Sequence, residues 1–376
     1  MLDEPLDRPR PISVAQRVLA GLHLDGPLLM GLLTVSGLGM FVLYSAGAEN
    51  MDLVLRQGAR IGLAATGMLV VAQIPPKLLR IWAPWMFLVG VGLLVLVLVM
   101  GEIGKGAQRW LDIGIVRFQP SEIMKLAVPM MAAWYLHERP LPPTIREALL
   151  VIGLIALMPA ALIAQQPDLG TALLIAASGI LVVLLAGMSI RLILAFGALA
   201  LAGAPLLWFN MHDYQRQRVL TFLNPESDPL GSGYHIIQSK IAIGSGGVFG
   251  KGWLNGTQAQ LEFLPERSTD FIFAVIGEEF GLLGLATFLT LYVLIVVRGL
   301  YIASQAQDTF GRLLAGSVSL TFFVYVFVNT GMVTGLLPVV GVPLPLVSYG
   351  GTSMVTLMAG FGMLMSIHSH RKLVPQ

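Results

Sequence analysis

Residues 81–100 read IWAPWMFLVGVGLLVLVLVM, a run of twenty residues without a charge. Because about 20 apolar residues in a helix span the hydrocarbon core of a bilayer, this stretch predicts a transmembrane helix. Comparable apolar stretches begin near residues 27, 57, 81, 120, 148, 169, 190, 271, 309 and 345. We therefore expect an all-α polytopic membrane protein, with about ten transmembrane helices in a single integral membrane domain over residues 1–376.

The composition predicts the same class of protein. Hydrophobic residues make up 56% of the chain and charged residues only 12%, about half the charged fraction of a soluble domain. The formal net charge is +2, and the basic residues lie at the ends of apolar stretches. Membrane lipids are therefore expected around the chain, and nucleic acid is not an expected partner. The absence of cysteine excludes disulfides and thiol catalysis.

The distribution of Lys and Arg predicts the orientation in the membrane. With ten spans both termini lie on one side, and the positive-inside rule assigns the more basic side to the cytoplasm. The short segments on that side contain Arg8, Arg10, Arg17, Lys77, Arg80, Arg139, Arg146, Arg191, Arg298, Arg312, Arg371 and Lys372. We therefore expect cytoplasmic N- and C-termini. Residues 1–25 form a cytoplasmic segment that is retained, because no small-residue cleavage site follows it.

One outer segment, residues 211–268 between spans seven and eight, is unusually long. Loops of more than about 15 residues are normally functional or disordered, and this one alternates turn residues such as Asn224-Pro225 with apolar runs such as Ile236-Ile237. That pattern predicts a large, partly helical extracytoplasmic segment. Residues 101–118 have the same mixed character, so we expect both segments to cover a cavity at the outer leaflet.

Five motifs resemble those of one family of membrane enzymes. They are residues 119–122 (QPSE), 224–235 (NPESDPLGSGYH), 241–252 (IAIGSGGVFGKG), 263–273 (FLPERSTDFIF) and 348–351 (SYGG). With them, essentially the whole chain resembles the shape, elongation, division and sporulation (SEDS) glycosyltransferases of the bacterial inner membrane. The run 266–271 is more similar to the elongation branch, the rod shape-determining proteins, than to the division branch.

This resemblance implies a function that composition does not reveal. It implies polymerisation of lipid II, an undecaprenyl pyrophosphate carrying a disaccharide-pentapeptide, into growing glycan strands linked to undecaprenyl pyrophosphate. It also implies a partner, a class B penicillin-binding protein that crosslinks those strands. No encoded cofactor is expected, and a divalent cation bound with the pyrophosphate is compatible with this chemistry.

The resemblance marks Asp270 as the catalytic residue. A carboxylate within hydrogen-bond reach of a sugar hydroxyl can accept its proton in the transition state of glycosyl transfer. In the competing interpretation, Ser268-Thr269-Asp270 only opens the next helix, with Thr269 as its cap and Asp270 near the positive end of the helix dipole. The two roles are compatible, and the family motif favours catalysis.

Glu122 and Lys125 lie three residues apart at the start of the fourth span, so they share one face of a helix. Charges inside a membrane are costly unless they are paired or face a polar cavity. We therefore expect an internal ion pair that marks a functional interior. The alternative is a pair that only neutralises itself near the interface, and the resemblance, which places the pair in a central cavity, favours a role in positioning Asp270 or the pyrophosphate.

Further residues are candidates for binding or support. A pyrophosphate leaving group needs positive side chains, and those on the outer side are Arg109, Lys125, Arg216, Arg218, Lys240 and Arg267. Each alone is more often a headgroup-facing cation, and Lys125, the deepest in a span, is the best candidate. Ser348 follows Pro343 and Pro345, which predict a broken start of the last span that lines a cavity or is buried in protein.

Glu278 and Glu279 lie roughly 12 to 14 Å beyond Asp270 along a helix. They predict either a polar path or a hydrogen-bonded contact between helices, and we favour the contact. The histidines show no spacing typical of metal ligands, so no protein-encoded metal site is expected.

Two other functions compete with a glycosyltransferase. A lipid flippase would also need a charged cavity such as the one expected around Glu122 and Lys125, but the candidate residues gather on one face and the sequence shows no convincing inverted repeat. A non-catalytic scaffold for a crosslinking enzyme would have little use for Asp270 beside a long outer segment.

Overall fold

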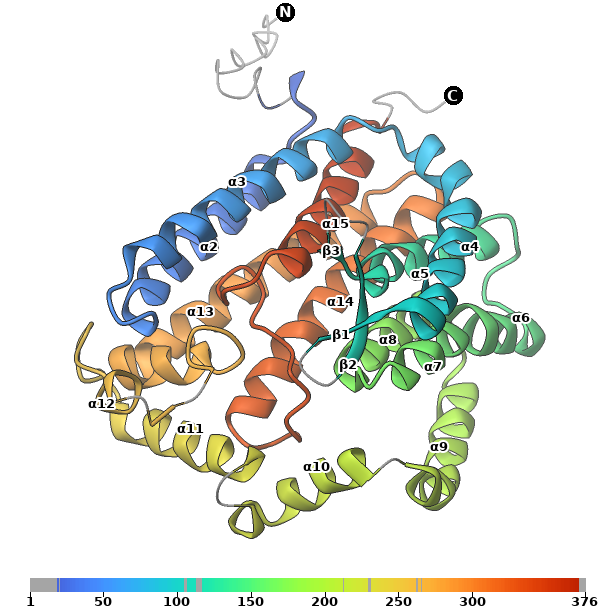
Figure 1. Cartoon of the computed structure of the whole chain (residues 1–376). Helices are drawn as coiled ribbons and strands as arrows, with labels where there is room; N and C mark the ends of the chain where they lie inside the picture. The colour runs from blue at the N-terminus through green and yellow to red at the C-terminus, as the bar shows by residue number, and fades with distance from the viewer. Residues whose placement is uncertain are drawn as a thin grey trace, which may run out of the picture.

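Helices make up most of this computed structural model (Figure 1). It describes residues 19, 21–104, 107–112, 117–211, 213–228, 231–261, 263–264 and 266–371. The longer helical elements are α2 (Gly26–Ala46), α3 (Met51–Ala72), α4 (Pro76–Met100), α5 (Pro120–Leu136), α6 (Ile145–Leu150) with the π-helix η1 (Val151–Leu157) and α7 (Met158–Gln165), α8 (Leu169–Leu185), α9 (Ile190–Asn210), α13 (Ile272–Ser304), α14 (Thr309–Val333) and α15 (Thr352–Ser369).

Each predicted span overlaps one of these helices, with α6, η1 and α7 together forming one. Five of them, α2, α4, α6–α7, α13 and α14, are long and apolar enough to cross a membrane. The count of ten spans stays a prediction. The last helix, α15, begins at Thr352, later than the expected residue 345. The segment before it is irregular because it contains Pro343 and Pro345 and because Leu346 has a positive φ of 65°.

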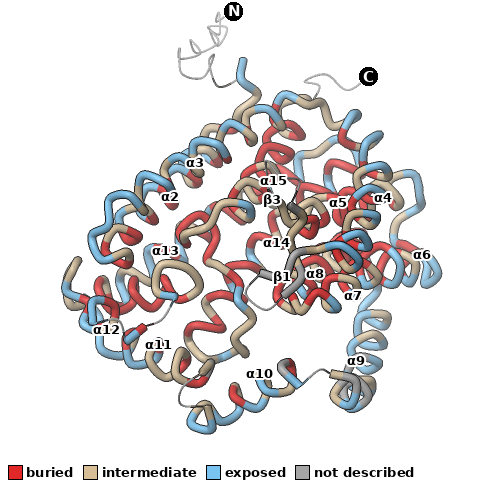
Figure 2. Tube along the Cα trace, viewed as in Figure 1, coloured by how far each residue is buried: buried red, intermediate tan, exposed pale blue. Residues whose placement is uncertain are grey.

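The outward faces of the helices are apolar. Figure 2 shows exposed residues along α2, α3 and α9 and buried residues concentrated in α14, α15 and α5. The exposed side chains include Leu63 at 65%, Leu88 at 61% and Leu201 at 81% of their full accessibility. Soluble proteins rarely expose large contiguous apolar patches, so these faces fit contact with lipid tails, as a multi-pass membrane protein requires.

The two ends of the described chain meet at one end of the bundle. The Nδ1 atom of His23 lies 3.2 Å from the Ser369 hydroxyl, and the rings of His23 and His370 stack at 4.5 Å. The carboxylate of Asp25, which caps α2, accepts two hydrogen bonds from Arg298 near the end of α13. The two ends of the described chain therefore lie at the same end of the bundle, which is consistent with the predicted even number of spans. Arg8, Arg10, Arg17 and Lys372, which belong to the predicted cytoplasmic side, lie outside the described residues.

The orientation of this shared side is testable. A tag after Gln376 should be accessible only from the cytoplasm, and a tag at the exposed Ser227 only from outside, because the basic short loops fix the orientation. The measurement is labelling of each tag in intact and permeabilised cells. Labelling of both tags from the same side would contradict the span count between them and the outer placement of Asp270.

The long segment between α9 and α13 contains short helices at the opposite end of the bundle (Figure 1). They are α10 (Asp213–Leu223), the 3-10 turn η2 (Pro225–Ser227), α11 (Ser232–Gly246) and α12 (Thr257–Gln260). The segment is thus partly helical, as predicted from its alternation of turn residues and apolar runs. Its extracytoplasmic location stays a prediction.

The expectation of an all-α chain is wrong in residues 101–118. This segment contains three short strands, β1 (Glu102–Gly104), β2 (Ala107–Asp112) and β3 (Arg117–Phe118), which pair antiparallel in the order β1-β2-β3. Trp110 pairs with Glu102, and Leu111 pairs with Phe118. Glycine recurs in this segment and disfavours a helix, whereas its aromatic and β-branched residues favour strands.

Candidate functional site

Asp270 lies in a turn of residues 266–271 that leads into α13. The backbone N–H groups of Thr269 and Phe271 both donate to the Glu266 carbonyl, at 3.0 and 3.3 Å. The Thr269 hydroxyl donates to the Glu266 carboxylate at 2.7 Å, and α13 begins at Ile272 without a side-chain cap. The interpretation of Thr269 as a helix cap is therefore wrong, because its hydroxyl turns back toward Glu266.

A second segment, residues 341–351, holds this turn from one side. The Ser348 hydroxyl donates to the Thr269 carbonyl and accepts a hydrogen bond from the Leu344 N–H at 2.8 Å. The Tyr349 N–H donates to the Ser268 carbonyl at 2.8 Å. Ser348 is only 4% exposed, so the structure gives it the position of a support for the Asp270 turn and not of a substrate contact.

Asn329 of α14 holds the turn from another side. Its Nδ2 atom donates to the carbonyls of both Asp270, at 2.8 Å, and Val342, at 2.7 Å. A Cβ added to Gly341, whose φ is 74°, would lie 3.6 Å from Oδ2 of Asp270. The half-buried carboxylate of Asp270 therefore lies beside the backbone of Gly341, in a position fixed by α14 and by the 341–351 segment.

The predicted ion pair between Glu122 and Lys125 is present in the first turns of α5. Nζ of Lys125 lies 2.7 Å from Oε1 of Glu122, and the two side chains are only 9% and 13% exposed. The same ammonium group lies 5.4 Å from the ring centroid of Tyr325 on α14. A cavity of about 30 Å³ borders Lys125, Thr321 and Tyr325, which is enough room for a water molecule.

Several polar atoms on α5 and α14 are buried without a hydrogen-bond partner. Among the described residues they include Ser121 Oγ, Glu122 Oε2, Thr321 Oγ1, Tyr325 OH and Asn329 Oδ1. The three on α14 recur every four residues and therefore lie on one face of that helix. A buried polar group without a partner costs about 1–3 kcal/mol, so this interior is suited to water or to the polar groups of a ligand.

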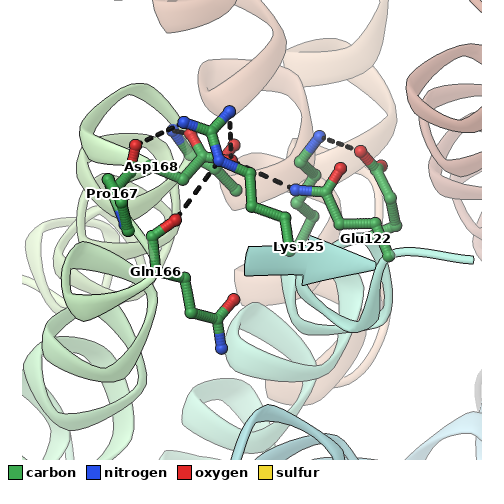
Figure 3. A network of polar contacts seen from close by, with 8 residues as sticks. Glu122, Lys125, Gln166, Pro167 and Asp168 are labelled. Atoms are coloured by element: carbon green, nitrogen blue, oxygen red, sulfur yellow. Dashed lines mark hydrogen bonds and ion pairs between the residues drawn. The ribbon is translucent and has the colours of Figure 1, made fainter. Parts of the chain in front are cut away.

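Arg109, on β2, forms hydrogen bonds and an ion pair with the connection between α7 and α8 (Figure 3). Its guanidinium donates to the Pro167 carbonyl and, at 3.3 Å, to the Gln166 carbonyl. It also lies 3.6 Å from a carboxylate oxygen of Asp168, to which Gln119 donates at 3.1 Å. Arg109 is therefore part of a network that joins strand β2 to the start of α8. Its contacts are those of a supporting residue at the edge of the site.

The Arg109 network connects to the Asp270 turn through the 341–351 segment and the residue before it. Gly170, in the first turn of α8, packs so closely on this loop that a Cβ there would lie 2.8 Å from the Val340 carbonyl. Asp270 and the Lys125 ammonium group thus each lie beside α14, at Asn329 and Tyr325 respectively, whereas Arg109 is linked to the loop through the start of α8.

Lys240 and Arg267 have other surroundings. The Arg267 guanidinium donates to the Ala259 carbonyl of α12. Lys240 is an exposed residue of α11 whose side chain lies against Gly335. These contacts are made to the outer segment and to the end of α14, and the role of both residues in binding pyrophosphate stays a prediction.

His235 of α11 packs against the last residue of the turn, Phe271. Its ring stacks on Phe271, with centroids 5.5 Å apart. Burial lowers the pKa of the His235 imidazole, against the opposing effect of the Glu266 and Asp228 carboxylates. Because this pKa is lowered, the ring, which lies against Phe271, contributes less positive charge near the turn than an ordinary histidine would.

Sequence reasoning missed Asn329, Tyr325 and Asp168. Asn329 and Tyr325 are polar residues within an otherwise apolar stretch of α14, and Asp168 follows Gln165-Gln166-Pro167 between two apolar stretches. Polar residues inside predicted spans are functional candidates by default, so this signal was available for Asn329 and Tyr325 but not for Asp168, which lies between two spans.

Comparison with known proteins identifies relatives over nearly the full chain. The family model of the cell cycle proteins FtsW, RodA and SpoVE matches residues 22–373. The peptidoglycan glycosyltransferase MrdB of Escherichia coli K12 is 56% identical over 354 residues, which cover 94% of this chain and 95% of MrdB. A probable peptidoglycan glycosyltransferase, FtsW of Trichlorobacter lovleyi, is 38% identical over 363 residues, which cover 93% of this chain and 94% of that protein.

Solved structures share the fold. A chain from a study of how a peptidoglycan synthase complex coordinates polymerization and crosslinking aligns with a TM-score of 0.80 and 34% identity, covering 93% of this chain and 99% of its own. The rod shape determining protein RodA of Thermus thermophilus aligns with a TM-score of 0.69 and 28% identity, covering 93% of this chain and 98% of its own. All the residues of the candidate site lie within the range that the family model matches.

Proposed function

The chain belongs to the FtsW, RodA and SpoVE family, and on this premise we propose that it polymerises lipid II, with Asp270 as the general base. It is a peptidoglycan glycosyltransferase of the SEDS type. The observation that carries the assignment of Asp270 is its position: a half-buried carboxylate, on a turn held by Asn329 and Ser348, beside an interior with unpartnered polar atoms.

The position of Asp270 supports the following reaction. The carboxylate of Asp270 accepts the proton of a sugar hydroxyl on the acceptor, and the hydroxyl oxygen attacks the anomeric carbon of the donor. The bond from that carbon to the pyrophosphate breaks, and undecaprenyl pyrophosphate leaves with the electron pair. A direct attack of this kind inverts the anomeric configuration.

Lys125 is the cation best placed to match the developing pyrophosphate charge. It is largely buried beside Tyr325, and a fixed charge in a water-poor site stabilises a transition state more than one in water. Glu122 holds its ammonium group in place, and Oε2 of Glu122 is buried without a partner among the described residues. A divalent cation bound with the pyrophosphate stays a prediction, and among the described residues no group of three His, Asp or Glu side chains could hold one.

A partner that crosslinks the product is part of the proposal. The structural relative from the study of a peptidoglycan synthase complex supports it, since that study concerns polymerization together with crosslinking. The chemistry fits a class B penicillin-binding protein, whose crosslinking domain acts on the same outer face. The elongation branch is supported by the likeness to RodA of Thermus thermophilus.

The test is polymerisation of lipid II by the purified protein, with and without a class B penicillin-binding protein and with and without a chelator. Extension of lipid II into glycan strands is the expected result. Loss of that activity in the presence of the chelator would show that the reaction needs a divalent cation. A protein that moves labelled lipid II across vesicles without extending it would be a flippase. A protein that only recruits the crosslinking enzyme would be a scaffold.

A further inference from the structure

Glu278 is a fully buried carboxylate that the proposed reaction does not use. It lies in the second turn of α13 and is 0% exposed. Its oxygens face the four-residue helix α12, which belongs to the outer segment. A buried carboxylate needs several donors to offset the loss of hydration, and here α12 and the loop before it supply them.

The contacts between Glu278 and this part of the outer segment are numerous. Lys251 Nζ lies 2.7 Å from Oε1, which also accepts hydrogen bonds from the Thr257 hydroxyl at 3.1 Å and the Gln258 N–H at 2.9 Å. The Ala259 N–H donates to Oε2 at 3.3 Å. A carboxylate at the first N–H groups of a helix is stabilised by them and orders them, so Glu278 fastens α12 to α13.

The other side of α12 contacts the chain just before the turn of residues 266–271 and, through Arg267, the turn itself. The Leu264 N–H donates to the Gln258 carbonyl at 3.2 Å. The Arg267 guanidinium donates to the Ala259 carbonyl. Gln258 and Ala259 therefore bind the Glu278 carboxylate through their N–H groups and the chain around the Asp270 turn through their carbonyls. A shift of the Glu278 carboxylate would move these two residues and, with them, the Asp270 turn.

The rest of this loop has anchors of its own. Trp253 stacks on Phe41 of α2 at 4.1 Å, and the N–H groups of Lys251 and Gly252 donate to the carbonyls of Glu278 and Glu279, each at 3.0 Å. These anchors do not involve the Glu278 carboxylate. Loss of that carboxylate would therefore release α12 while the loop as a whole stays on the bundle.

We propose that Glu278 is a positioning residue for glycosyl transfer, which acts by holding α12 and, through it, the turn that carries Asp270. The inference rests on the proposed role of Asp270. A displacement of about 1 Å in a catalytic group can cost a hundredfold in rate. The effect of Glu278 should therefore fall on kcat, because substrate binding uses other side chains.

The test compares Glu278→Gln with a matched control, Asp25→Asn. Both substitutions neutralise a buried carboxylate that pairs with a cation on or beside α13, and Lys251 and Arg298 are each 27% exposed. Asp25 is the N-cap of α2, and α2 begins at the end of the bundle where the chain termini lie, opposite to α12 (Figure 1). A merely destabilising loss of buried charge would act alike in both variants.

Because the chain contains no cysteine, Leu261→Cys provides a single site for a nitroxide label at the end of α12, where the side chain is 64% exposed. In Glu278→Gln we expect kcat to fall by about ten- to a hundredfold, KM to change by less than about twofold, and the label to become more mobile. In Asp25→Asn we expect kcat and label mobility close to those of the parent protein.

Two results would overturn the proposal: an unchanged kcat in Glu278→Gln, or an equal loss of kcat in Asp25→Asn. Lys251→Met provides a second variant in case Glu278→Gln folds poorly. It removes the ion pair but leaves the N–H donors of α12, so it should lower kcat less while increasing label mobility. Asp270→Asn, assayed in parallel, separates the assignment of Asp270 as the base from the assignment of Glu278 as the residue that holds α12. Wild-type activity in Asp270→Asn would refute the first assignment, and the mobility of the label would still test the second.

Discussion

Asp270→Asn is expected to lower the rate of lipid II polymerisation by a factor of about 100 or more, the lower end of what a positioned general base supplies. Asparagine keeps the shape of the side chain but cannot accept the hydroxyl proton. The backbone contacts that hold the turn, from Asn329 to the Asp270 carbonyl and from Ser348 to the Thr269 carbonyl, do not involve the carboxylate. The variant should therefore fold, insert and bind its partner.

Glu266→Gln is the matched control, because Glu266 is a second carboxylate on the same turn and is exposed. Its side chain accepts a hydrogen bond from Thr269, which glutamine can also accept. Its activity should stay within a few-fold of the parent protein, since an exposed substitution of this kind changes stability by about 0.5 kcal/mol or less. Near-normal extension of lipid II by Asp270→Asn would refute the catalytic assignment, and a large loss in Glu266→Gln would move it to Glu266.

The features that the sequence predicts well are local ones. Residues 81–100 predict a transmembrane helix because the hydrophobicity of one stretch determines whether a helix is stable in lipid. Glu122 and Lys125 form the expected pair because a spacing of three residues brings side chains together on any helix. Both predictions need no knowledge of how the helices pack.

The features that the sequence does not predict depend on distant segments. Asn329 is 59 residues from Asp270, whose carbonyl it binds, and Arg109 is 58 residues from Pro167. Glu278 and Glu279 form the predicted hydrogen-bonded contacts between helices, but the sequence does not say which helices they contact, namely the short α12 and the distant α2. Hydrophobic pattern contains no information about such pairings, because each depends on the packing of the whole bundle.

The hairpin at β1 and β2 was missed for a different reason. Residues 101–118 mix apolar and polar residues much as the longer outer segment does, and they were predicted only to help cover a cavity within an all-α chain. The strands there are at most six residues long, which is too short for a clear alternation of apolar and polar side chains to stand out.

Removing either member of the Glu122–Lys125 pair should have the second large effect. Lys125→Ala and Glu122→Ala each leave an uncompensated, largely buried charge, which costs about 3–5 kcal/mol, so both should lose thermal stability as well as polymerisation. Lys125→Ala should lose more activity at equal stability, because the ammonium group is also proposed to match the pyrophosphate charge. Melting temperature and polymerisation rate, measured on the same purified proteins, separate the two effects.

The exchanged pair, Glu122→Lys with Lys125→Glu, decides between support and catalysis. It restores an ion pair on the same face of α5, so most of the lost thermal stability should return. It also places a carboxylate where an ammonium group now lies 5.4 Å from the Tyr325 ring, which forfeits a cation–π contact of about 0.5–2 kcal/mol. That loss is small beside the about 3–5 kcal/mol recovered, so the exchanged protein should be folded.

If Lys125 matches the pyrophosphate charge, this folded protein should still polymerise poorly, because the cation has moved to position 122. Full polymerisation by the exchanged pair would show that the pair only supports the fold, and the assignment of Lys125 to the pyrophosphate would be wrong.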